Sequence, residues 1–303
     1  MSDINIAVEG GTSVRLKTAG KYCDRDILVT ATGGGSESST NNLDSFLSGT
    51  LPKLESNVES VKNYACHRHL DLTDVLLPEV TTIGEYAFYN CDNLVNLSAP
   101  KVTTIKSYAF DGCDKLAALD TPMLSTLGTY SFRSCSALSS ANVPLLTTIP
   151  AYGFHGCKSL TSIVAPDVTN AQTYAFAYCS AIQQFDFQNL TTVGDRAFTG
   201  CSALEEINFP LLTDVKTGCF QNCTNLKRAI IPSCTYVRAS AFYGCTSLEY
   251  IDFSGCTKVP LLGGNNAFTD VPTTCEFRVP AALYDEWIAD TNWTAYTSYI
   301  VAV

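Results

Sequence analysis

The sequence predicts an α/β repeat protein, a solenoid in which short parallel strands stack from coil to coil. Three observations support this fold class. A 22-residue period runs through most of the chain, apolar residues occupy fixed columns within it, and one segment of each unit alternates apolar and polar residues. Together they indicate coils that bury one face against their neighbours.

Phenylalanine and cysteine mark the period most clearly. Each cysteine follows a phenylalanine by three residues, and an aliphatic residue, from Leu94 to Leu248, follows three later. The phenylalanines are Phe88, Phe110, Phe132, Phe154, Phe176, Phe198, Phe220 and Phe242, and the cysteines are Cys91, Cys113, Cys135, Cys157, Cys179, Cys201, Cys223 and Cys245. Such columns over eight rows do not arise by chance.

Each unit is too short to bury its own apolar side chains, so it must share a core with its neighbours. Tyr64-Ala65-Cys66 extends the frame backwards, which gives nine 22-residue units over residues 58–260. The Leu-x-x-Leu-x-Ala segment predicts a strand with one inward face, which a proline closes. The Thr-Thr pairs favour extended backbone, and the Tyr-Ala-Phe-x-x-Cys segment predicts a short helical or 3₁₀ turn on the other side.

This unit resembles the BspA-like leucine-rich repeat, also called the Treponema pallidum type. Residues 84–94, Gly-Glu-Tyr-Ala-Phe-Tyr-Asn-Cys-Asp-Asn-Leu, show the match most fully, and the resemblance covers about two-thirds of the chain. Cys66 and His69 replace the first Phe and the first Cys. The resemblance implies a right-handed leucine-rich-repeat solenoid with capped ends and a bacterial surface protein of adhesion and recognition.

The flanking segments predict four further parts. Residues 1–33 alternate apolar and polar residues and predict a small β module, and residues 34–42 are a flexible polar linker. Residues 43–57 predict an N-terminal cap with Leu47, Leu51 and Leu54 as its apolar residues. The period breaks after Phe242, so residues 261–303 predict a C-terminal cap, with a closing strand at 277–280 and a short helix at 281–289.

The first module is also similar, over residues 18–27, to small modules in tail proteins of phages and prophages of Gram-positive bacteria. That similarity implies a virion-associated binding protein. A module of this size needs trimerisation or docking to be stable, so we expect a homo-oligomer through residues 1–33. The N-terminus lacks the pattern of a signal peptide, which suits a trimmed leader, another route of export or a protein that stays inside the cell. Of these, the two resemblances favour an extracellular, cell-surface or virion location.

Composition excludes several function classes. The net charge of −10 argues against nucleic acid and anionic lipid as partners. No apolar run reaches about 18 residues, so we expect no membrane insertion.

The 14 cysteines predict core filling instead of disulfides or metal. In-register neighbours point their Cβ atoms the same way, which suits a disulfide poorly. Cys234 and Cys256 stack in another core column, whereas Cys23 and Cys275 lie outside the repeats and are less constrained. Residues 66–69, Cys-His-Arg-His, resemble half a zinc site without a second cluster, so we expect no metal and no cofactor.

Catalytic groups are sparse. The three histidines lie in no recognised catalytic motif. Asp120, Asp186 and Asp252 share an outward column, but they stand three coils apart, over about 14 Å at about 4.8 Å per coil. A carboxylate pair for glycoside hydrolysis needs a shorter separation. We therefore expect no enzyme.

Partner binding has two candidate surfaces. One is a tyrosine column, Tyr64, Tyr86, Tyr108, Tyr130, Tyr152 and Tyr174. Tyrosine is enriched at binding hot spots, although such a column could also be a half-buried stack that supports coil pairing. The other is the outward strand positions, whose variation suits either a tailored surface or drift: Asp120, Asn142, Asp186, Asn208, Glu206, Arg228, Tyr250 and Asp252.

These observations favour a surface or virion-associated recognition or adhesion protein that binds a protein or glycan on another cell or host through the solenoid. The alternative is a structural connector or assembly protein, in a phage tail or a cell-surface scaffold, without ligand specificity.

Overall fold

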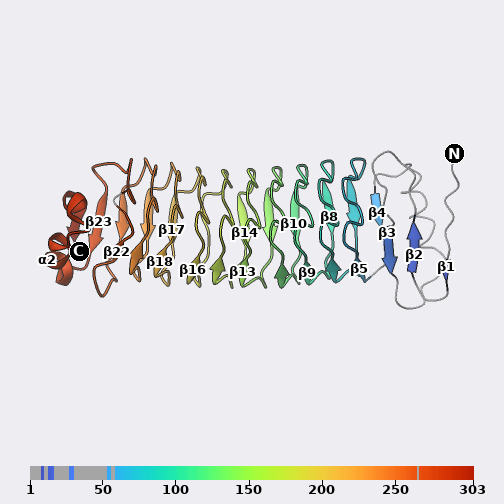
Figure 1. Cartoon of the computed structure of the whole chain (residues 1–303), viewed down its shortest axis with the longest axis horizontal. Coiled ribbons are helices and arrows are strands. Elements are labelled where there is room, and N and C mark those ends of the chain that lie inside the picture. The colour runs from blue at the N-terminus through green and yellow to red at the C-terminus, as the bar shows by residue number, and fades with distance from the viewer. Residues whose placement is uncertain (1–7, 10–12, 17–26, 31–52, 56–58, 265) are drawn as a thin grey trace. The chain divides into compact units, whose positions relative to one another are not determined.

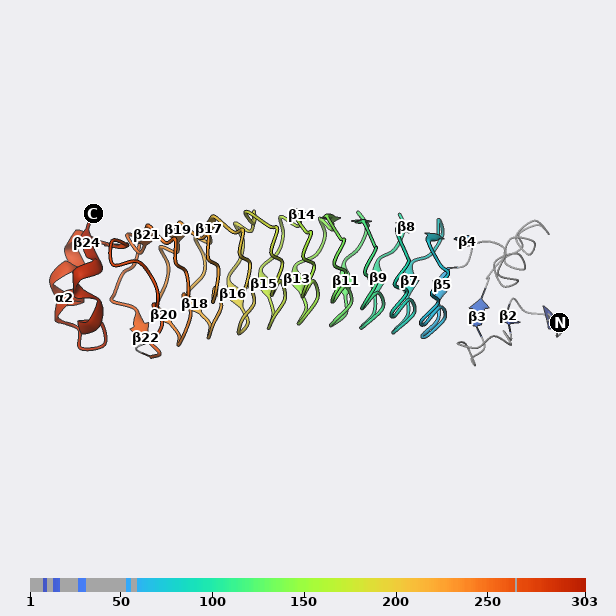
Figure 2. The same ribbon diagram turned by 90° about the horizontal axis from the view of Figure 1, so that it is seen from above.

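The computed structural model describes residues 8–9, 13–16, 27–30, 53–55, 59–264 and 266–303 (Figure 1). The chain divides into two compact units, residues 1–146 (unit 1) and residues 147–303 (unit 2). Each unit is a solenoid in which short parallel strands pair from coil to coil, and Figure 2 shows the same strands from above. The predicted fold class is confirmed.

Unit 1 carries two sets of parallel strands. Three-residue strands form what we call the strand face, and two-residue strands form the return face. The strand face comprises β4 (Lys53–Glu55), β6 (Asp74–Leu76), β8 (Asn96–Ser98), β10 (Ala118–Asp120) and β12 (Ser140–Asn142). The return face comprises β5 (Ser60–Val61), β7 (Thr82–Ile83), β9 (Thr104–Ile105) and β11 (Thr126–Leu127). Strands β1 (Val8–Glu9), β2 (Ser13–Leu16) and β3 (Ile27–Thr30) pair antiparallel, and β3 pairs with β5.

Unit 2 repeats this arrangement and ends in helical turns. Its strand face comprises β14 (Ser162–Val164), β17 (Glu206–Asn208), β19 (Arg228–Ile230), β21 (Tyr250–Asp252), β23 (Glu276–Val279) and β24 (Ile300–Ala302). Its return face comprises β13 (Thr148–Ile149), β15 (Asn170–Ala171), β16 (Thr192–Val193), β18 (Asp214–Val215), β20 (Tyr236–Val237) and β22 (Leu261–Leu262). The 3₁₀ turns η1 (Ala281–Leu283) and η2 (Thr294–Tyr299) flank the helix α2 (Tyr284–Ala289).

The strands pair in a register of one repeat. Arg228 lies opposite Tyr250, and Thr82 lies opposite Thr104, each 22 residues apart. Leu54 of the predicted N-terminal cap pairs with Val75 as part of a parallel strand. The predicted linker at 34–42 and the remaining leucines of that cap lie outside the described residues, as does Cys23.

The phenylalanine column forms a continuous stack inside each unit. All eight predicted phenylalanines are fully buried. Consecutive rings within a unit stack with centroids 5.1–5.7 Å apart, and Phe268 continues the stack beyond the period break. The strict period therefore lets identical side chains pack on one another in every coil.

One described coil of unit 2 has no strand on the strand face. Phe185 stands there in the column that holds Val, Leu, Ile or Ala in the other repeats and Phe277 in β23, and its ring lies 4.9 Å from both Phe176 and Phe198. It is buried all the same. Residues 184–186 form no strand, although Phe277 stands in the same column within β23.

The cysteine column contributes hydrogen bonds as well as volume. The thiol of Cys113 donates to the carbonyl oxygen of Phe88 at 3.1 Å, and Cys135 bonds Phe110 in the same way. The same carbonyl of Phe88 accepts the N–H of Cys91 in its own coil. All thirteen cysteines of the described residues are buried free thiols.

Cys275 corrects one sequence-based interpretation. The sequence predicts a less constrained thiol outside the repeats, but only 2% of Cys275 is exposed. The reason is that the strand face continues through β23 into the C-terminal segment, so Cys275 belongs to a further coil.

Aromatic residues of the C-terminal segment close the core of unit 2. Trp287 and Trp293 are fully buried, and Trp293 donates its indole N–H to the carbonyl of Pro260 at 2.8 Å. Their rings pack on Phe253, and that of Trp293 also packs on Phe268. Among the described residues, no helix has the length and hydrophobicity to cross a membrane.

The phenylalanine stack gives a first prediction. Phe132→Ala should lower the free energy of unfolding by about 3–5 kcal/mol, because it leaves a void beside Phe110 that the stack cannot fill. Met123→Ala, on an exposed side chain of the same unit, should change it by less than about 0.5 kcal/mol. Urea denaturation measures both, and equal effects would contradict the role of the stack.

The buried thiols give a second prediction. Burial raises the pKa of Cys223 from its ordinary value of 9.0 to about 12. Above pH 9 the unfolded chain loses the thiol proton while the folded chain keeps it, so this stability is complete below pH 9 and declines as pH rises towards 12. The slope is about 1.4 kcal/mol per pH unit for each such thiol.

The measurement compares the wild type with Cys223→Ala in urea at pH 8, 9 and 10 under reducing conditions. The variant should lose less stability between pH 9 and 10 than the wild type does. Parallel pH profiles for the two proteins would show that this thiol is not protected by the fold.

Candidate partner-binding surfaces

The Tyr-Ala-Phe segment of each coil has an unusual backbone. It forms the predicted turns with bonds between residues three apart, such as Ala87 N–H to Gly84 O, but left-handed residues interrupt them. Alternate N–H groups, those of Tyr86, Phe88 and Asn90, all donate to carbonyls of the next coil at 2.8–3.2 Å. The alternation turns side chains at Tyr86 outward and those at Phe88 inward.

All six tyrosines of the predicted column have left-handed backbone angles. Their φ values lie between 54° and 61°, a region that costs a residue with a side chain about 1–2 kcal/mol. Arg196, Gly218 and Ser240 take the same position in later coils with φ of 54°, 61° and 57°. The backbone therefore accepts several residue types here and does not itself require tyrosine.

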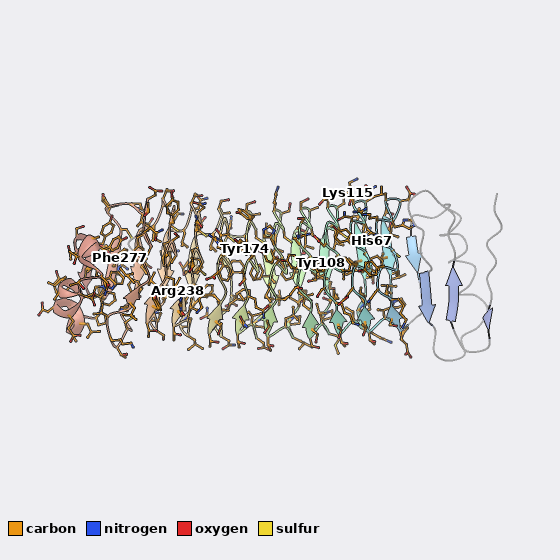
Figure 3. All side chains as sticks on the ribbon, in the orientation of Figure 1. His67, Tyr108, Lys115, Tyr174, Arg238 and Phe277 are labelled. Atoms are coloured by element: carbon orange, nitrogen blue, oxygen red, sulfur yellow. The ribbon has the colours of Figure 1, made fainter. Side chains whose placement is uncertain are left out.

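The tyrosine rings stack within each unit. In unit 1 the centroids of Tyr64, Tyr86, Tyr108 and Tyr130 are 4.9, 4.6 and 4.6 Å apart and the rings are nearly parallel. In unit 2 the rings of Tyr152 and Tyr174 stack at 4.8 Å. Tyr64 is exposed and the other five are half-buried, so the edges face solvent while the faces contact one another. Figure 3 labels Tyr108 and Tyr174.

A second row of side chains, three residues further along each coil, lies beside the tyrosines of unit 1. The His67 and Tyr89 rings stack at 5.1 Å. Arg133 donates two hydrogen bonds to the buried carboxylate of Asp111, at 2.9 and 2.6 Å, and these bonds raise the pKa of the guanidinium. The Arg133 guanidinium also lies 5.0 Å from the ring centroid of Tyr130. We call this surface of unit 1 the aromatic flank.

Sequence reasoning missed this second row. The signal was the column three residues after the tyrosines, which holds His67, Tyr89, Asp111 and Arg133 in unit 1. Its side chains share no chemical class, so no pattern stood out. Only the ring contacts and the Arg133–Asp111 pair show that they form one surface with the tyrosines.

Unit 2 holds another aromatic residue that the sequence interpretation missed. Tyr178 is 50% exposed and has φ of 62°, at a column that holds Gly, Asn or Ser in most coils. Its ring lies 5.4 Å from that of His155, which in turn contacts Tyr152. A Cβ on Gly200 would lie 2.7 Å from the Tyr178 ring, so the next coil needs glycine there.

The strand face carries the second predicted set of residues, and many of them pair with each other. Asn142 donates to Asp120 at 2.8 Å in unit 1, and Arg228 forms an ion pair with Glu206 in unit 2. Asp252 accepts the N–H of Ser254 at 2.8 Å. Asp186 is exposed and Asn208 is half-buried. The first two contacts join neighbouring coils, and Asp186 and Asp252 lie on different coils of unit 2.

Tyr250 has a different partner from its predicted neighbours. The guanidinium of Arg278 lies over the Tyr250 ring, 3.7 Å from its centroid. Arg278 comes from β23, in the segment that the sequence assigns to the cap, so the sequence interpretation did not include it.

The described residues form no cluster of three or more His, Cys, Asp or Glu side chains that could hold a metal ion. Burial raises the pKa of the Cys201 and Cys113 thiols and holds them in the unreactive protonated form. The outward surfaces instead offer aromatic edges, hydroxyls and paired charges, which are groups that bind partners.

Comparison with known proteins identifies the repeat. The family model described as the BspA type leucine rich repeat region matches in six copies, over residues 59–183 and 147–276. A search of curated proteins finds no significant match to the chain.

Solved structures of other leucine-rich repeat proteins are similar to this chain. A leucine-rich repeat protein from Bacteroides ovatus ATCC 8483 is 19% identical, with a TM-score of 0.51, and the alignment covers 99% of this chain and 98% of that one. A leucine rich cell surface protein from Faecalibacterium prausnitzii A2-165 is 20% identical, with a TM-score of 0.40 and coverage of 92% and 95%. The T. pallidum leucine rich repeat protein is 24% identical, with a TM-score of 0.47 and coverage of 51% and 79%.

The family match settles the class of protein at a coarse level. Proteins of this type are typically surface-associated and take part in protein interactions, and their solenoids are generally scaffolds without catalytic activity. The match extends over more than half of the chain, in the same residues that form the stacked coils. The chain therefore belongs to the BspA type of leucine-rich repeat proteins.

Proposed function

We propose that this chain is a recognition protein of a bacterial or virion surface, and that it binds a protein partner through the aromatic flank of unit 1. The observation that carries this proposal is the placement of tyrosine at left-handed backbone positions that Gly218 and Ser240 occupy equally well in unit 2. Strained positions persist in a fold where the residue serves a purpose.

Ring stacking between coils does not fully explain why tyrosine stands at these positions. A stacked aromatic pair contributes about 0.5–1.5 kcal/mol, while the left-handed backbone costs a side chain about 1–2 kcal/mol. The stack therefore offsets the backbone strain at best. Glycine would form the same backbone hydrogen bonds without that strain. Gly218 does so, donating its N–H to Ala239 O at 3.0 Å.

The arrangement of the rings favours a protein over a glycan. The tyrosines of unit 1 stack at 4.6–4.9 Å, so neighbouring rings occupy the faces on which a sugar would lie. Their exposed edges and hydroxyls, together with Arg133, suit the mixed apolar and hydrogen-bonding contacts of a protein interface. Four coils at about 4.8 Å each extend over about 15 Å, which fits the centre of an ordinary interface.

The test uses the double variant Tyr86→Ser, Tyr108→Ser. Serine is chosen because Ser240 occupies the equivalent position with φ of 57°. We expect the free energy of unfolding to fall by about 1.5–4.5 kcal/mol, because three stacked ring pairs are lost. Binding to a protein partner should weaken by about tenfold or more, because tyrosines at the centre of an interface contribute most of its energy.

Partners are sought with the wild-type protein on an array of bacterial and host surface proteins and on a glycan array, and each hit is then measured with the variants. A matched control, Asn96→Ser with Asp120→Ser, changes the strand face of the same coils. Hits that bind both double variants equally, or hits on the glycan array alone, would refute the proposal.

A further inference from the structure

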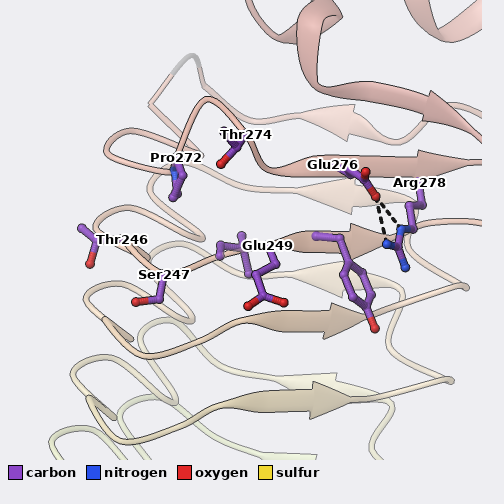
Figure 4. Close-up of a pocket in the computed structure, with 9 residues that line it drawn as sticks. Thr246, Ser247, Glu249, Pro272, Thr274, Glu276 and Arg278 are labelled. Atoms are coloured by element: carbon purple, nitrogen blue, oxygen red, sulfur yellow. Dashed lines mark hydrogen bonds and ion pairs between the residues drawn. The ribbon is translucent and has the colours of Figure 1, made fainter.

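A hollow of about 470 Å³ lies on the strand face of unit 2, next to β21 and β23 (Figure 4). Its polar lining includes Glu249, Tyr250, Glu276 and Arg278, and Pro272 and Thr274 form part of the wall. This volume lies within the usual range of about 300–1,000 Å³ for small binding sites. The hollow is separate from the aromatic flank, which belongs to unit 1.

A shift in the coil of β23 creates the hollow. In the preceding coil, the buried Cys245 and Leu248 are three residues apart, whereas the buried Val271 and Cys275 are four apart. The N–H of Cys275 bonds Pro272 O at 3.0 Å and closes this longer turn. As a result Thr274, which stands at the column of Leu248, is exposed.

The segment that leads from this longer turn into β23 is one residue shorter than its counterpart in the coil of β21. Two residues, Glu249 and Tyr250, separate the buried Leu248 from the buried Ile251 in β21. Glu276 alone separates Cys275 from Phe277 in the next coil. No side chain of the β23 coil therefore stands over Glu249, and the space remains open.

The column that contains Glu249 alternates charges in the preceding coils. The Lys227 ammonium contacts the Glu205 carboxylate one coil away at 3.0 Å. Glu249 follows Lys227 in the same column, is exposed, and has no ion pair to a described residue. The next position in the column, where a cation would continue the alternation, is the one that the shifted register leaves empty.

The cation that lines the hollow, Arg278, contacts Glu276 and Tyr250 and forms no ion pair with Glu249. The Nε and Nη2 atoms of Arg278 both lie 2.9 Å from one oxygen of Glu276, as Figure 4 shows, and the guanidinium lies over the Tyr250 ring. Glu249, Glu276 and Arg278 leave the hollow with a net charge of −1. The protein as a whole carries −10, which favours the approach of cations.

We propose that this hollow binds the ammonium group of a lysine side chain presented by a partner protein. The ammonium would lie one coil beyond Glu249, as Lys227 lies one coil beyond Glu205, with Pro272 beside the methylene chain. A neutral saccharide would find hydroxyls there, but it would leave Glu249 without an ion pair. The proposal is independent of the aromatic flank.

The experiment measures binding of a short peptide, acetyl-Gly-Lys-Gly-amide, to the full chain by NMR. Its matched control is the same peptide with norleucine, which keeps the methylenes and lacks the ammonium. We expect the lysine peptide to shift the backbone amides of residues 246–250 and 274–278. The norleucine peptide should bind about fivefold more weakly, as the loss of one exposed ion pair predicts.

Two protein variants separate the site from the general field of an acidic protein. Glu249→Gln should weaken the lysine peptide about fivefold, because it removes the carboxylate that lacks an ion pair. Glu79→Gln removes the same charge from an exposed side chain of unit 1 and should leave the affinity within about twofold. The Tyr86→Ser, Tyr108→Ser protein should bind the peptide as the wild type does, which keeps this test distinct from that of the flank.

Three results would overturn the proposal. Equal binding of the lysine and norleucine peptides would show that the ammonium is not recognised. Equal weakening by Glu249→Gln and Glu79→Gln would show an effect of net charge alone. Shifts at residues 246–250 caused by chitotriose and not by the lysine peptide would identify a saccharide site instead.

Discussion

The whole structure depends on one constraint: a coil of 22 residues cannot bury its own apolar side chains and must share its core with the coils beside it. The fully buried Phe110 shows this sharing, since its ring contacts Phe88 on one side and Phe132 on the other. Its cysteine neighbours reinforce it, because the thiol of Cys135 bonds the carbonyl of Phe110 across the coil boundary. A side chain in this core therefore packs mainly against the residues at the same position of the neighbouring coils, 22 residues away.

The same constraint leaves the outer positions free. Each coil needs the inward residues and the backbone bonds, and it needs little from outward side chains such as Asn96 or Tyr108. An outward position repeated over several coils becomes a row of side chains at about 4.8 Å spacing, which can carry a binding surface without altering the core. The tyrosines and the row of His67, Tyr89, Asp111 and Arg133 form such a surface in unit 1.

Departures from the period have structural consequences as well. The coil with Phe185 keeps its place in the stack but forms no strand at residues 184–186. In the coil of β23 the turn is one residue longer and the segment that leads into the strand is one residue shorter. This shift leaves a hollow beside Glu249. The core is not weakened, since Cys275 and Phe277 remain buried. In both coils the core is kept and the surface changes.

The sequence by itself determined the fold class, the inward columns and the outward columns, because a strict period makes residues 22 apart neighbours in space. It therefore placed the Phe and Cys residues of the 22-residue columns correctly and brought the tyrosines together, but it left Cys275 outside the repeats. Only the tertiary structure decided how separate columns meet: that Arg133 pairs with Asp111 beside Tyr130, that Tyr178 lies over Gly200, and that Arg278 covers Tyr250. These contacts join different columns or follow a break in the period, and they depend on side-chain direction and backbone angle, which a count of residues does not contain.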